Sequence, residues 1–575
     1  MTPRTEAADS LHAMKYRSPG EDFEESVNRF AFGLADDGHH YHAIRDVCLA
    51  QRFLPGGRIQ GAIGATRQTT AFNCMVSGTI EDSLVEGDGS IMMRLLEAAA
   101  TSKLGGGIGY DFSTIRPHGD RVKKIETYAT GPVSFMEYFN TVGLGVASSG
   151  HRRGAQMAVL RVDHPDVEVF VNAKKKKGAL EGFNVSVAVT DKFMEAVAND
   201  SLFPLSFGGT TYREIRAVDL WEKIMRSTWD YAEPGVLFID TVNRMNNLWY
   251  CETIAATNPC GEQPLPPYGA CLLGSFNLVQ YLRKKLVDPS ADSDEYYFDF
   301  DQLRSDVPTI VRAMDNVTDR TNYPLPAQKA EALAKRRMGL GVTGLANALE
   351  SCGHDYGSSG FLALEAQILE AIRDETYRAS TVLAKEKGSF PMLDRTKYLE
   401  GEFVKTLPED VRDAIARDGI RNSHLTSIAP TGTISLCADN VSSGIEPVFA
   451  YATKRTINAP DGPVVSTIGD YGSEFLGVRG KLAADVTPDE HVAVLVTAQR
   501  YVDSAVSKTV NVTKKTPWDD FTGIYRRVYE GGGKGCTTFN ADGSRMALLV
   551  AESPKNEGEG GTCAIDPETG RKDCA

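Results

Sequence analysis

The sequence predicts an α/β protein with a buried sheet, because two stretches in its carboxyl-terminal half join a helix, a glycine stop and a short strand. Pro517 begins the first helix, Gly531 ends it, and residues 536–539 form the strand-like run that follows. Residues 408–419 and 425–428 repeat the arrangement. Helices that alternate with short apolar strands are typical of layered α/β folds.

The composition supports this class and excludes others. Apolar residues make up 42% of the 575 residues and charged residues 24%, as in ordinary globular proteins, so collagen, coiled coil and wholesale disorder are excluded. The formal net charge of −14 argues against a duplex nucleic acid as the main partner. We therefore expect no nucleic acid partner.

We expect a cytoplasmic protein without a membrane segment. No apolar run has the length that spans a bilayer, and residues 1–18 carry charges throughout, unlike a signal peptide. The cysteines are too few and too scattered for a disulfide scaffold. None of them has the spacing of a zinc site, so no metal site is predicted.

The two ends of the chain differ from the rest. Residues 1–22 show no pattern and are expected to be loose, whereas apolar residues recur at helical spacing over 23–34, which predicts the first packed helix. Residues 552–575 are rich in glycine and glutamate and have almost no large apolar side chains, which predicts a mobile tail. This tail nevertheless holds Cys563 and Cys574.

Two groups of glycines predict special backbone positions. Gly339, Gly341 and Gly344 match G-x-G-x-x-G, but a basic helical segment precedes them instead of a strand. We therefore expect a tight turn leading into a buried strand, and not a dinucleotide site. Residues 105–109 hold four glycines that fit neither this fingerprint nor a P-loop, and they predict a very close approach of the backbone to another group.

Residues 256–277, ATNPCGEQPLPPYGACLLGSFN, carry the candidate chemistry. Asn258, Cys260 and Glu262 alternate, so in an extended loop their side chains would face one small volume. An amide, a thiol and a carboxylate would supply an orienting hydrogen bond, a reactive sulfur and a general base. Spacing alone leaves a second interpretation open, a surface loop with a chance cysteine.

This segment resembles the finger loop of ribonucleotide reductases, and the form NPCGEQPL is similar to that of the adenosylcobalamin-dependent class II enzymes. Further blocks resemble the family in the same order along most of the chain: FLPGGRI at 53–59, FNCMVSGTIEDS at 72–83, GGGIGYDFSTIRPHG at 105–119, HRRGAQMAVLRVDHPD at 151–166, FNVSVAVTDKFM at 183–194, RRMGLGVTGLANAL at 336–349, RNSHLTSIAPTGTIS at 421–435 and GIEP at 444–447. A match of this extent outweighs the interpretation as a chance cysteine.

The resemblance implies a ten-stranded α/β barrel made of two parallel five-stranded halves, with the finger loop at its centre. The expected division is an N-terminal helical region over 1–60, the catalytic barrel over 61–550 and a flexible redox tail over 551–575. The chain begins close to the barrel, so we expect no ATP-cone and no overall activity site for ATP and dATP.

The resemblance also implies roles for five residues. Cys260 matches the thiyl radical that activates C3′ of the ribose, Glu262 the base that takes the 3′-OH proton, and Asn258 the amide that hydrogen-bonds the ribose hydroxyls. Cys74 and Cys271 match the pair that supplies a proton and two electrons and ends as a disulfide. Almost 200 positions separate these two cysteines, so only the fold can bring them together.

A substrate phosphate site follows from the resemblance. Phosphates need N–H groups and hydroxyls, ideally at a helix N-terminus. The matching segment provides Pro430, Thr431, Gly432, Thr433, Ile434 and Ser435. An ordinary Ser/Thr helix cap is the alternative interpretation of this segment.

The resemblance implies a second nucleotide site, for a deoxynucleoside triphosphate or ATP effector at a homodimer interface. Asp82 and Arg116 match residues that contact this effector, and an arginine is a suitable phosphate partner. Arg152, Arg153 and Gln156 match the loop that relays the identity of the effector. Each of these residues is also compatible with an ordinary surface position.

The radical source that the resemblance implies is adenosylcobalamin. Residues 535–545 lack the adjacent tyrosines of class I enzymes, and no glycyl-radical motif of class III is found near the C-terminus. Tyr296 and Tyr297 are adjacent, but they lie in the acidic run EYYFDFD and are predicted to be strand residues.

A dithiol reductant must regenerate the buried cysteine pair, and thioredoxin or a glutaredoxin-like protein is the expected partner. Cys563 and Cys574 fit a relay to that partner, although their spacing is wide for the family. Two alternatives remain open: a class I large subunit that needs a separate radical-generating subunit, and a non-catalytic nucleotide-binding regulator on the same barrel. The motifs do not distinguish ribonucleoside diphosphates from triphosphates as substrates.

Overall fold

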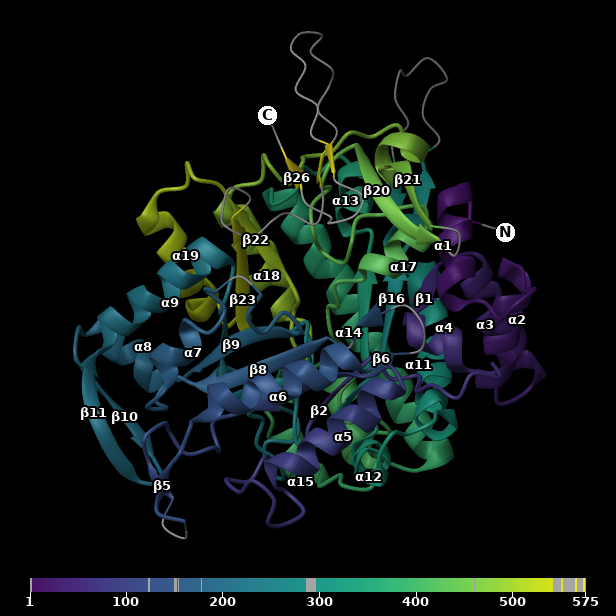
Figure 1. Ribbon diagram of the computed structural model, residues 1–575. Helices are drawn as coiled ribbons and strands as arrows, with labels where there is room; N and C mark the ends of the chain where they lie inside the picture. The colour runs from purple at the N-terminus through teal and green to yellow at the C-terminus, as the bar shows by residue number, and fades with distance from the viewer. Residues whose placement is uncertain are drawn as a thin grey trace.

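The computed structural model describes residues 3–122, 125–148, 152–153, 155–176, 178–285, 296–459 and 462–540, together with three short strands at 550–551, 564–565 and 572–573. Two main β-sheets lie inside the molecule, and helices cover them from outside (Figure 1). None of the helices in the described part of the chain is long and apolar enough to cross a membrane.

Three helices form the N-terminal region: α1 (Glu6–Tyr16), α2 (Phe23–Leu34) and α3 (Gly38–Leu49). The predicted helix over 23–34 is confirmed, and a capping box between Asp22 and Glu25 begins it. The expectation that residues 1–22 are loose is wrong for residues 6–16. The side chain of Thr5 accepts a hydrogen bond from the N–H of Ala8, which starts α1.

The larger sheet has the strand order β15-β2-β3-β8-β9-β12-β23-β22. Its five central strands, from β2 to β12, run parallel, β15 and β23 pair antiparallel to β2 and β12, and β22 is parallel to β23. The bounds are β2 (Cys74–Val76), β3 (Gly107–Asp111), β8 (Gln156–Arg161), β9 (Phe183–Val189), β12 (Gly235–Phe238), β15 (Ala270–Cys271), β22 (Thr509–Val512) and β23 (Gly535–Asn540).

A second sheet has the order β1-β16-β19, with β1 (Phe53–Pro55) antiparallel to β16 (Leu273–Asn277) and β16 parallel to β19 (Gly339–Thr343). Parallel bridges continue from this sheet, Leu340 to Thr426 and Ile428 to Val506. Because β15 and β16 follow each other in the chain, residues 270–277 take part in both sheets.

Helices pack on the outside of the sheets, and Figure 1 shows α5 and α6 in front of the larger sheet. Their bounds are α4 (Gly57–Ala62), α5 (Ile91–Lys103), α6 (Pro132–Gly145), α7 (Val167–Val171), α8 (Asp191–Ala198), α9 (Ala217–Tyr231), α10 (Ile239–Arg244), α11 (Phe300–Arg320), α12 (Pro326–Lys335), α13 (Leu345–Ser351), α14 (Ser359–Lys387), α15 (Arg395–Leu399), α16 (Glu409–Asp418), α17 (Gly432–Cys437), α18 (Pro488–Gln499) and α19 (Trp518–Glu530), with short turns η1 (Leu278–Tyr281), η2 (Val404–Thr406) and η3 (Gly472–Leu476).

The remaining strands form small ribbons: β4 (Arg121–Val122) with β5 (Thr127–Tyr128), β6 (Ala147–Ser148) with β7 (Arg152–Arg153), β10 (Leu202–Phe207) with β11 (Thr210–Arg216), β13 (Ala256–Thr257) with β14 (Pro264–Leu265), β17 (Leu282–Lys284) with β18 (Tyr296–Phe298), β20 (Ala452–Ala459) with β21 (Gly462–Gly469) and β24 (Val550–Ala551), and β25 (Ala564–Ile565) with β26 (Lys572–Asp573). Helices α16 and α19 and strands β18 and β23 confirm the sequence predictions. The short strand predicted over residues 425–428 is not formed as a continuous strand: only Thr426 and Ile428 form isolated β-bridges.

Candidate active site

The candidate loop is a narrow hairpin whose two strands, β13 and β14, pair Thr257 with Pro264. A tight turn joins them: the N–H of Gly261 donates to the carbonyl oxygen of Asn258 at 3.0 Å, and the N–H of Asn258 donates to that of Gln263 at 3.1 Å. Gly261 has a φ of 81°, a conformation that suits glycine. The expectation of an extended loop over residues 258–262 is therefore wrong. We call residues 256–265 the finger hairpin.

Glycines on both sheets let the finger hairpin fit between them. A Cβ added to Gly109 in β3 would lie 1.8 Å from the carbonyl oxygen of Thr257, and one added to Gly339 in β19 would lie 2.3 Å from Nε2 of Gln263. The close approach predicted for residues 105–109 is confirmed. The expected tight turn at Gly339 and Gly341 is wrong, because both glycines lie inside the buried strand itself.

The fold brings Cys74 and Cys271 together, as expected. They are direct partners in the antiparallel pairing of β2 with β15. Directly opposed residues have Cα atoms about 4.5–5.5 Å apart, which lies inside the range that a disulfide spans. A Cβ added to Gly107 would lie 3.1 Å from the sulfur of Cys74 and 3.2 Å from Cγ of Pro259, so the pair is next to the finger hairpin.

Burial and nearby charge determine the protonation state of Cys271 in this pair. Cys271 is fully buried, and burial raises its pKa well above the ordinary value for a cysteine. Negative charge on Glu262, Cys74 or Cys260 raises the pKa of Cys271 further, which shows that these groups are close enough to interact. Cys271 is therefore a protonated thiol near neutral pH.

The side chains of the finger hairpin differ in their exposure. Asn258 and Glu262 are buried, whereas Cys260 is exposed at the tip of the turn. The side-chain oxygen of Asn258 accepts from the N–H of Gln263 at 2.9 Å. Its Nδ2, like Nε2 of Gln263, is buried and has no hydrogen-bond partner among the described residues. Two buried donors beside a reactive thiol are available for an oxygen-rich ligand.

Three side chains and one backbone amide hold the carbonyl oxygens of the finger hairpin, all at 2.9 Å. Nδ2 of Asn184 donates to Pro259, the hydroxyl of Ser507 to Cys260, and both the hydroxyl of Ser427 and the N–H of Ala505 to Glu262. Sequence reasoning missed these contacts. Uncharged polar residues bonded to backbone carbonyls leave no spacing pattern that could have revealed them.

The predicted phosphate segment begins a helix. Thr431 precedes α17 with a φ of 52°, and its side chain makes no cap hydrogen bond to that helix. Its hydroxyl oxygen instead accepts from the N–H of Gly444 at 2.7 Å and lies 3.0 Å from the hydroxyl of Thr343. The interpretation as an ordinary Thr cap is thus wrong, and the first-turn N–H groups are not capped by Thr431.

The predicted effector residues fall into two groups. Arg116 forms an ion pair with Asp82 at 2.8 Å, and its backbone N–H donates to the same carboxylate at 3.1 Å. Gln156 is buried, with Oε1 accepting from the hydroxyl of Tyr110 and Nε2 donating to the carbonyl oxygen of Phe139. Arg152 and Arg153 form β7, next to β8 in the chain.

The two predicted redox-tail residues, Cys563 and Cys574, lie outside the described residues.

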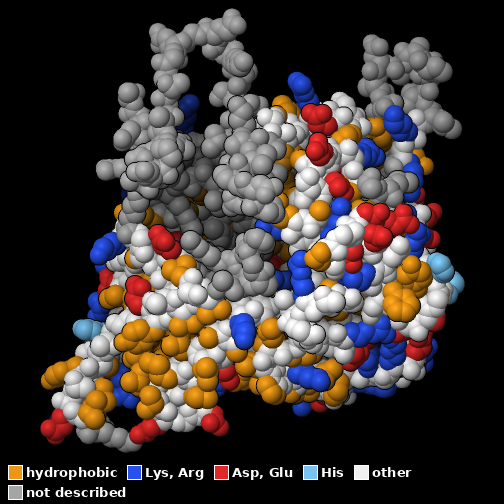
Figure 2. Space-filling view, turned by 45° about the vertical axis from the view of Figure 1, so that its right-hand side comes forward, with side chains coloured by type: hydrophobic (Ala, Val, Ile, Leu, Met, Phe, Trp, Pro, Cys, Tyr) orange, Lys and Arg blue, Asp and Glu red, His pale blue; other side chains and the backbone are white. Residues whose placement is uncertain are grey.

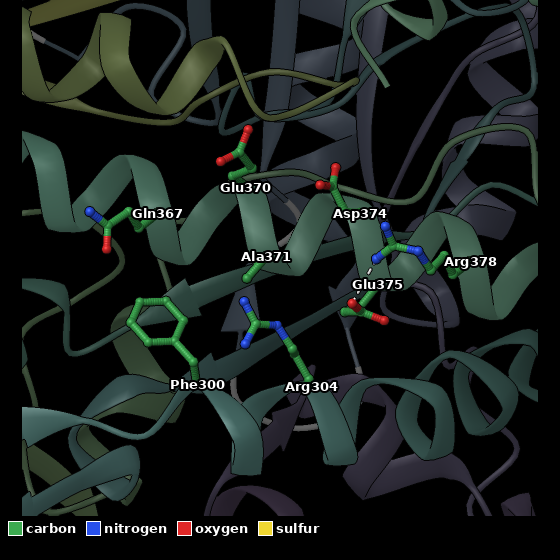
Figure 3. A pocket seen from close by; sticks show the side chains of 8 residues that line it. All are labelled: Phe300, Arg304, Gln367, Glu370, Ala371, Asp374, Glu375 and Arg378. Carbon is green, nitrogen blue, oxygen red and sulfur yellow. Dashed lines mark hydrogen bonds and ion pairs between the residues drawn. The ribbon is translucent and has the colours of Figure 1, made fainter. Parts of the chain in front are cut away.

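A groove of about 360 Å³ lies elsewhere, between α11 and α14 (Figure 3). Charged side chains dominate its lining, and none of its residues was a predicted site residue. Within the described ranges, no cluster of three or more His, Cys, Asp or Glu side chains could hold a metal ion.

The finger hairpin lies between two sheets and carries a thiol, a carboxylate and an amide, and a facing cysteine pair lies beside it. This arrangement defines an α/β enzyme equipped for thiol redox chemistry. The family model of the ribonucleotide reductase barrel domain matches residues 72–468 and 480–539. The chain therefore belongs to the ribonucleotide reductase family.

Relatives narrow this assignment. The chain is 36% identical to the vitamin B12-dependent ribonucleoside-diphosphate reductase of Mycobacterium tuberculosis (strain CDC 1551 / Oshkosh), over 83% of this chain and 68% of the relative. It is 32% identical to the enzyme of the same name from Thermoplasma acidophilum, over 92% of this chain and 69% of the relative. The vitamin B12-dependent ribonucleotide reductase of Streptomyces coelicolor is 26% identical, over 90% and 61%. These relatives group the chain with the class II members.

Proposed function

We propose that this chain is an adenosylcobalamin-dependent reductase that converts ribonucleoside diphosphates to 2′-deoxyribonucleotides. The observation that carries the proposal is the convergence of Cys260, Glu262 and Asn258 on one hairpin with the facing pair Cys74 and Cys271 beside it. The names of the relatives from M. tuberculosis and T. acidophilum favour diphosphates over triphosphates.

The five residues divide the reaction between them. A thiyl radical on Cys260 removes the hydrogen atom from C3′, while Glu262 accepts the 3′-OH proton and Asn258 donates to a ribose hydroxyl through its unpartnered Nδ2. The 2′-OH then leaves as water. Cys74 and Cys271 supply two protons and two electrons and become a disulfide. Cys260 returns its hydrogen atom to C3′, and Glu262 returns its proton to the 3′ oxygen. Each cycle thus consumes one dithiol and releases one water.

Cys260 fits a cofactor that approaches from outside the hairpin. Its side chain is exposed, and a Cβ added to the neighbouring Gly261 would meet no atom within 4 Å. Cys260 and Gly261 would face the cofactor at the tip of the finger hairpin. When bound, adenosylcobalamin would supply one-electron chemistry, and the thiol of Cys260 would be the group that gives up its hydrogen atom.

The strands would close into a ten-stranded barrel around the finger hairpin. Support comes from a series of contacts around the hairpin. Strands β2 to β12 pair in order and continue to β23 and β22, Ile428 bridges to Val506 just before β22, and Thr426 bridges to Leu340 of β19. Strand β19 pairs with β16, and the chain leads from β16 back through β15 to β2. Five strands, β2 to β12, lie on one side of the antiparallel junctions, and β23, β22, the bridged segment 426–428, β19 and β16 lie on the other. We assign the barrel to residues 61–550, following the N-terminal helical region over 1–60.

The substrate phosphates would bind the start of α17, over residues 430–435. The side chain of Thr431 does not cap the first N–H groups of that helix, which supports this assignment, because amides at a helix N-terminus attract phosphate.

The effector would bind near Asp82 and Arg116, in a homodimer that buries an apolar surface of α5 and α6. Figure 2 shows hydrophobic side chains gathered on one lower area of the molecule. Met93 and Leu96 of α5 are 39% and 63% exposed, and Tyr138 of α6 is 50% exposed. Apolar patches of this kind typically mark protein interfaces. The relay of effector identity is assigned to Arg152, Arg153 and Gln156.

Cys563 and Cys574, in the tail over residues 551–575, would pass electrons from thioredoxin or a glutaredoxin-like protein to the pair of Cys74 and Cys271. The need for a carrier supports this role, since a bulky reductase has no access to the fully buried Cys271.

The test is an assay of the purified chain with adenosylcobalamin, a small dithiol and either CDP or CTP, and no second protein. The proposal expects formation of dCDP that requires the cofactor, with CTP a poorer substrate. Turnover that requires an added radical-generating subunit would instead identify a class I large subunit, and nucleotide binding without any product would identify a regulator.

A further inference from the structure

The segment 503–507 contacts both reactive groups of the finger hairpin through their backbone. The N–H of Ala505 donates to the carbonyl oxygen of Glu262, and the hydroxyl of Ser507 donates to that of Cys260, each at 2.9 Å. The neighbouring segment 425–428 adds a third bond, from the hydroxyl of Ser427 to Glu262. The relative position of the thiol and the carboxylate therefore depends on how these two segments are aligned.

The carboxylate of Asp503 sets that alignment. Its Oδ2 accepts from the N–H of Leu425 at 2.7 Å, and its Oδ1 accepts from the N–H of Thr426 at 3.1 Å. The backbone N–H of Asp503 donates in return to the hydroxyl of Thr426 at 2.9 Å. Asp503 thus holds segment 425–428 against segment 503–507. The point of attachment lies next to Ser427 in one segment and two residues before Ala505 in the other, so it positions both anchors of the finger hairpin.

Two further side chains support Asp503 from other elements. The hydroxyl of Tyr377, on α14, donates to Oδ2 at 2.8 Å. Lys534 lies just before β23, and its ammonium group donates to the carbonyl oxygens of Asp503 and Ser504 at 2.6 and 2.5 Å. Asp503 is 1% exposed and Lys534 is 4% exposed. Hydrogen bonds to a buried charged group are strong, and losing such a group disturbs the whole network.

We propose that Asp503 is a positioning residue for ribonucleotide reduction, which acts by fixing the carbonyl oxygens of Glu262 and Cys260 through residues 503–507. The inference rests on the proposed function. Asp503 does not touch the reacting atoms; it keeps the base and the thiol in one geometry. A displacement of about 1 Å at such a site can lower a rate about a hundredfold.

The test compares Asp503→Asn with Asp306→Asn. An asparagine at 503 turns an NH₂ group toward donors that need an acceptor, so the two segments move apart. Asp306 is the matched control, since it is also buried and also accepts from a tyrosine hydroxyl, that of Tyr281, at 3.0 Å. The residues bonded to Asp306, which include Arg52 and Gln302, are not those that hold the finger hairpin.

Two readouts are measured. Hydrogen–deuterium exchange of the Ala505 amide is expected to accelerate about tenfold or more in D503N and to stay at the wild-type rate in D306N. With adenosylcobalamin, CDP and a dithiol, kcat of D503N is expected to fall about tenfold to a hundredfold while KM for CDP changes less than about twofold. If Asp503 only stabilised the fold, D503N would instead behave like D306N: the fraction of active protein would fall in both variants, and kcat per active molecule would stay normal.

Each outcome decides the question. A normal kcat in D503N overturns the proposal, and so does an unchanged exchange rate at Ala505. If D503N does not fold, Tyr377→Phe replaces it, because this variant removes one hydrogen-bond donor to Asp503 and keeps the carboxylate. Faster exchange of the Ala505 amide and a lower kcat are then expected, each by a few-fold. The absence of both changes overturns the proposal. Wild-type protein that forms no dCDP at all would overturn the proposed function, whereas turnover lost in Glu262→Gln but normal in D503N would overturn the positioning role alone.

Discussion

At the scale of single residues, burial distinguishes the three cysteines to which the proposed function gives different roles. Cys260 is exposed at the tip of the finger hairpin, where a radical source can reach it, whereas Cys271 is buried opposite Cys74. Burial and nearby negative charge raise the pKa of Cys271, so it keeps its hydrogen at neutral pH. A protonated thiol is what the reduction step requires.

Replacing Cys260 with serine is expected to abolish dCDP formation and leave CDP binding unchanged. The hydroxyl hydrogen of serine is held too strongly to be removed, but the shape of the turn hardly changes. Turnover assays and calorimetric CDP binding check this result. Cys251→Ser is the control, because Cys251 is also an exposed cysteine. Turnover of C260S above a few per cent of the wild-type rate would rule out the radical role.

Glu350 gives a prediction for stability. Burial raises its pKa to about 7, and the charges of Asp470 and Asp355 add to the rise. A raised carboxyl pKa contributes stability that is full below the unfolded value of about 4.5 and is lost as the pH rises through about 7. The contribution of Glu350 to the free energy of unfolding should therefore fall between pH 4.5 and 7.

Glu350→Gln should remove this part of the fall, since glutamine stays neutral and can still accept from the N–H of Lys481, which lies 2.7 Å from the carboxylate. Denaturant titrations at several pH values measure the difference. Equal pH slopes in the two proteins would show that Glu350 titrates normally.

At the scale of elements, the finger hairpin is held between two strands that lack side chains where it passes. Gly109 faces Thr257 from β3, and Gly339 faces Gln263 from β19. The hairpin itself has only a few backbone hydrogen bonds, so its position depends on these close contacts and on the side chains that bind its carbonyl oxygens.

Gly109→Ala is expected to displace the hairpin, because the new methyl group would lie 1.8 Å from the carbonyl oxygen of Thr257. Overpacking of this kind costs about 1–3 kcal/mol of stability, and we expect activity to fall more steeply than stability. Gly38→Ala is the control, since no atom lies within 4 Å of its added Cβ. Thermal unfolding and CDP turnover measure both effects; wild-type turnover in G109A would mean that the hairpin position is not critical.

Elements with strong local signals were predictable from the sequence, and contacts between distant segments were not. Helices α2, α16 and α19 combine an apolar stripe with clear end signals. Helix α1 was missed because only two of the four residues that it buries, Leu11 and Tyr16, are large and apolar, so its sequence shows no clear apolar stripe. The turn at Gly261 was missed because alternating residues suggested extended backbone.

The candidate site was predictable only as a set of residue types until the resemblance to a family placed them together. Nothing local in the sequence pairs Cys74 with Cys271, because that pairing depends on the register of β2 and β15. The anchors Asn184, Ser427 and Ser507 were not predictable either, since they bind backbone carbonyls without a motif of their own.

At the scale of the whole molecule, residues from both ends of the chain meet at one hairpin. The larger sheet supplies Cys74 and the glycines of β3, and the second sheet with its bridged segments supplies Gly339, Ser427 and Ala505. Cys271, which is buried, and Cys74, which is partly buried, lie where residues 270–277 join the two sheets. A bulky protein reductant has no access to the fully buried Cys271, which is why the proposed function includes a carrier.

Removing residues 555–575 is expected to spare folding, because that segment has no apolar stripe to bury. Turnover driven by thioredoxin should fall steeply, while turnover driven by a small dithiol should persist at a substantial fraction. Parallel assays with the two reductants measure the contrast. Unchanged thioredoxin-driven turnover would mean that Cys563 and Cys574 are incidental, and an equal loss with both reductants would point to a role in folding or substrate binding.

The most direct test of the account follows the two facing thiols through one reaction cycle. A chain carrying Cys563→Ser and Cys574→Ser is reduced, freed of dithiol and mixed with adenosylcobalamin and CDP, and the products are analysed by mass spectrometry. The proposed function predicts about one dCDP per active site and an equal amount of a peptide pair joined by a disulfide between Cys74 and Cys271. Formation of dCDP with both of these cysteines still reduced would contradict it.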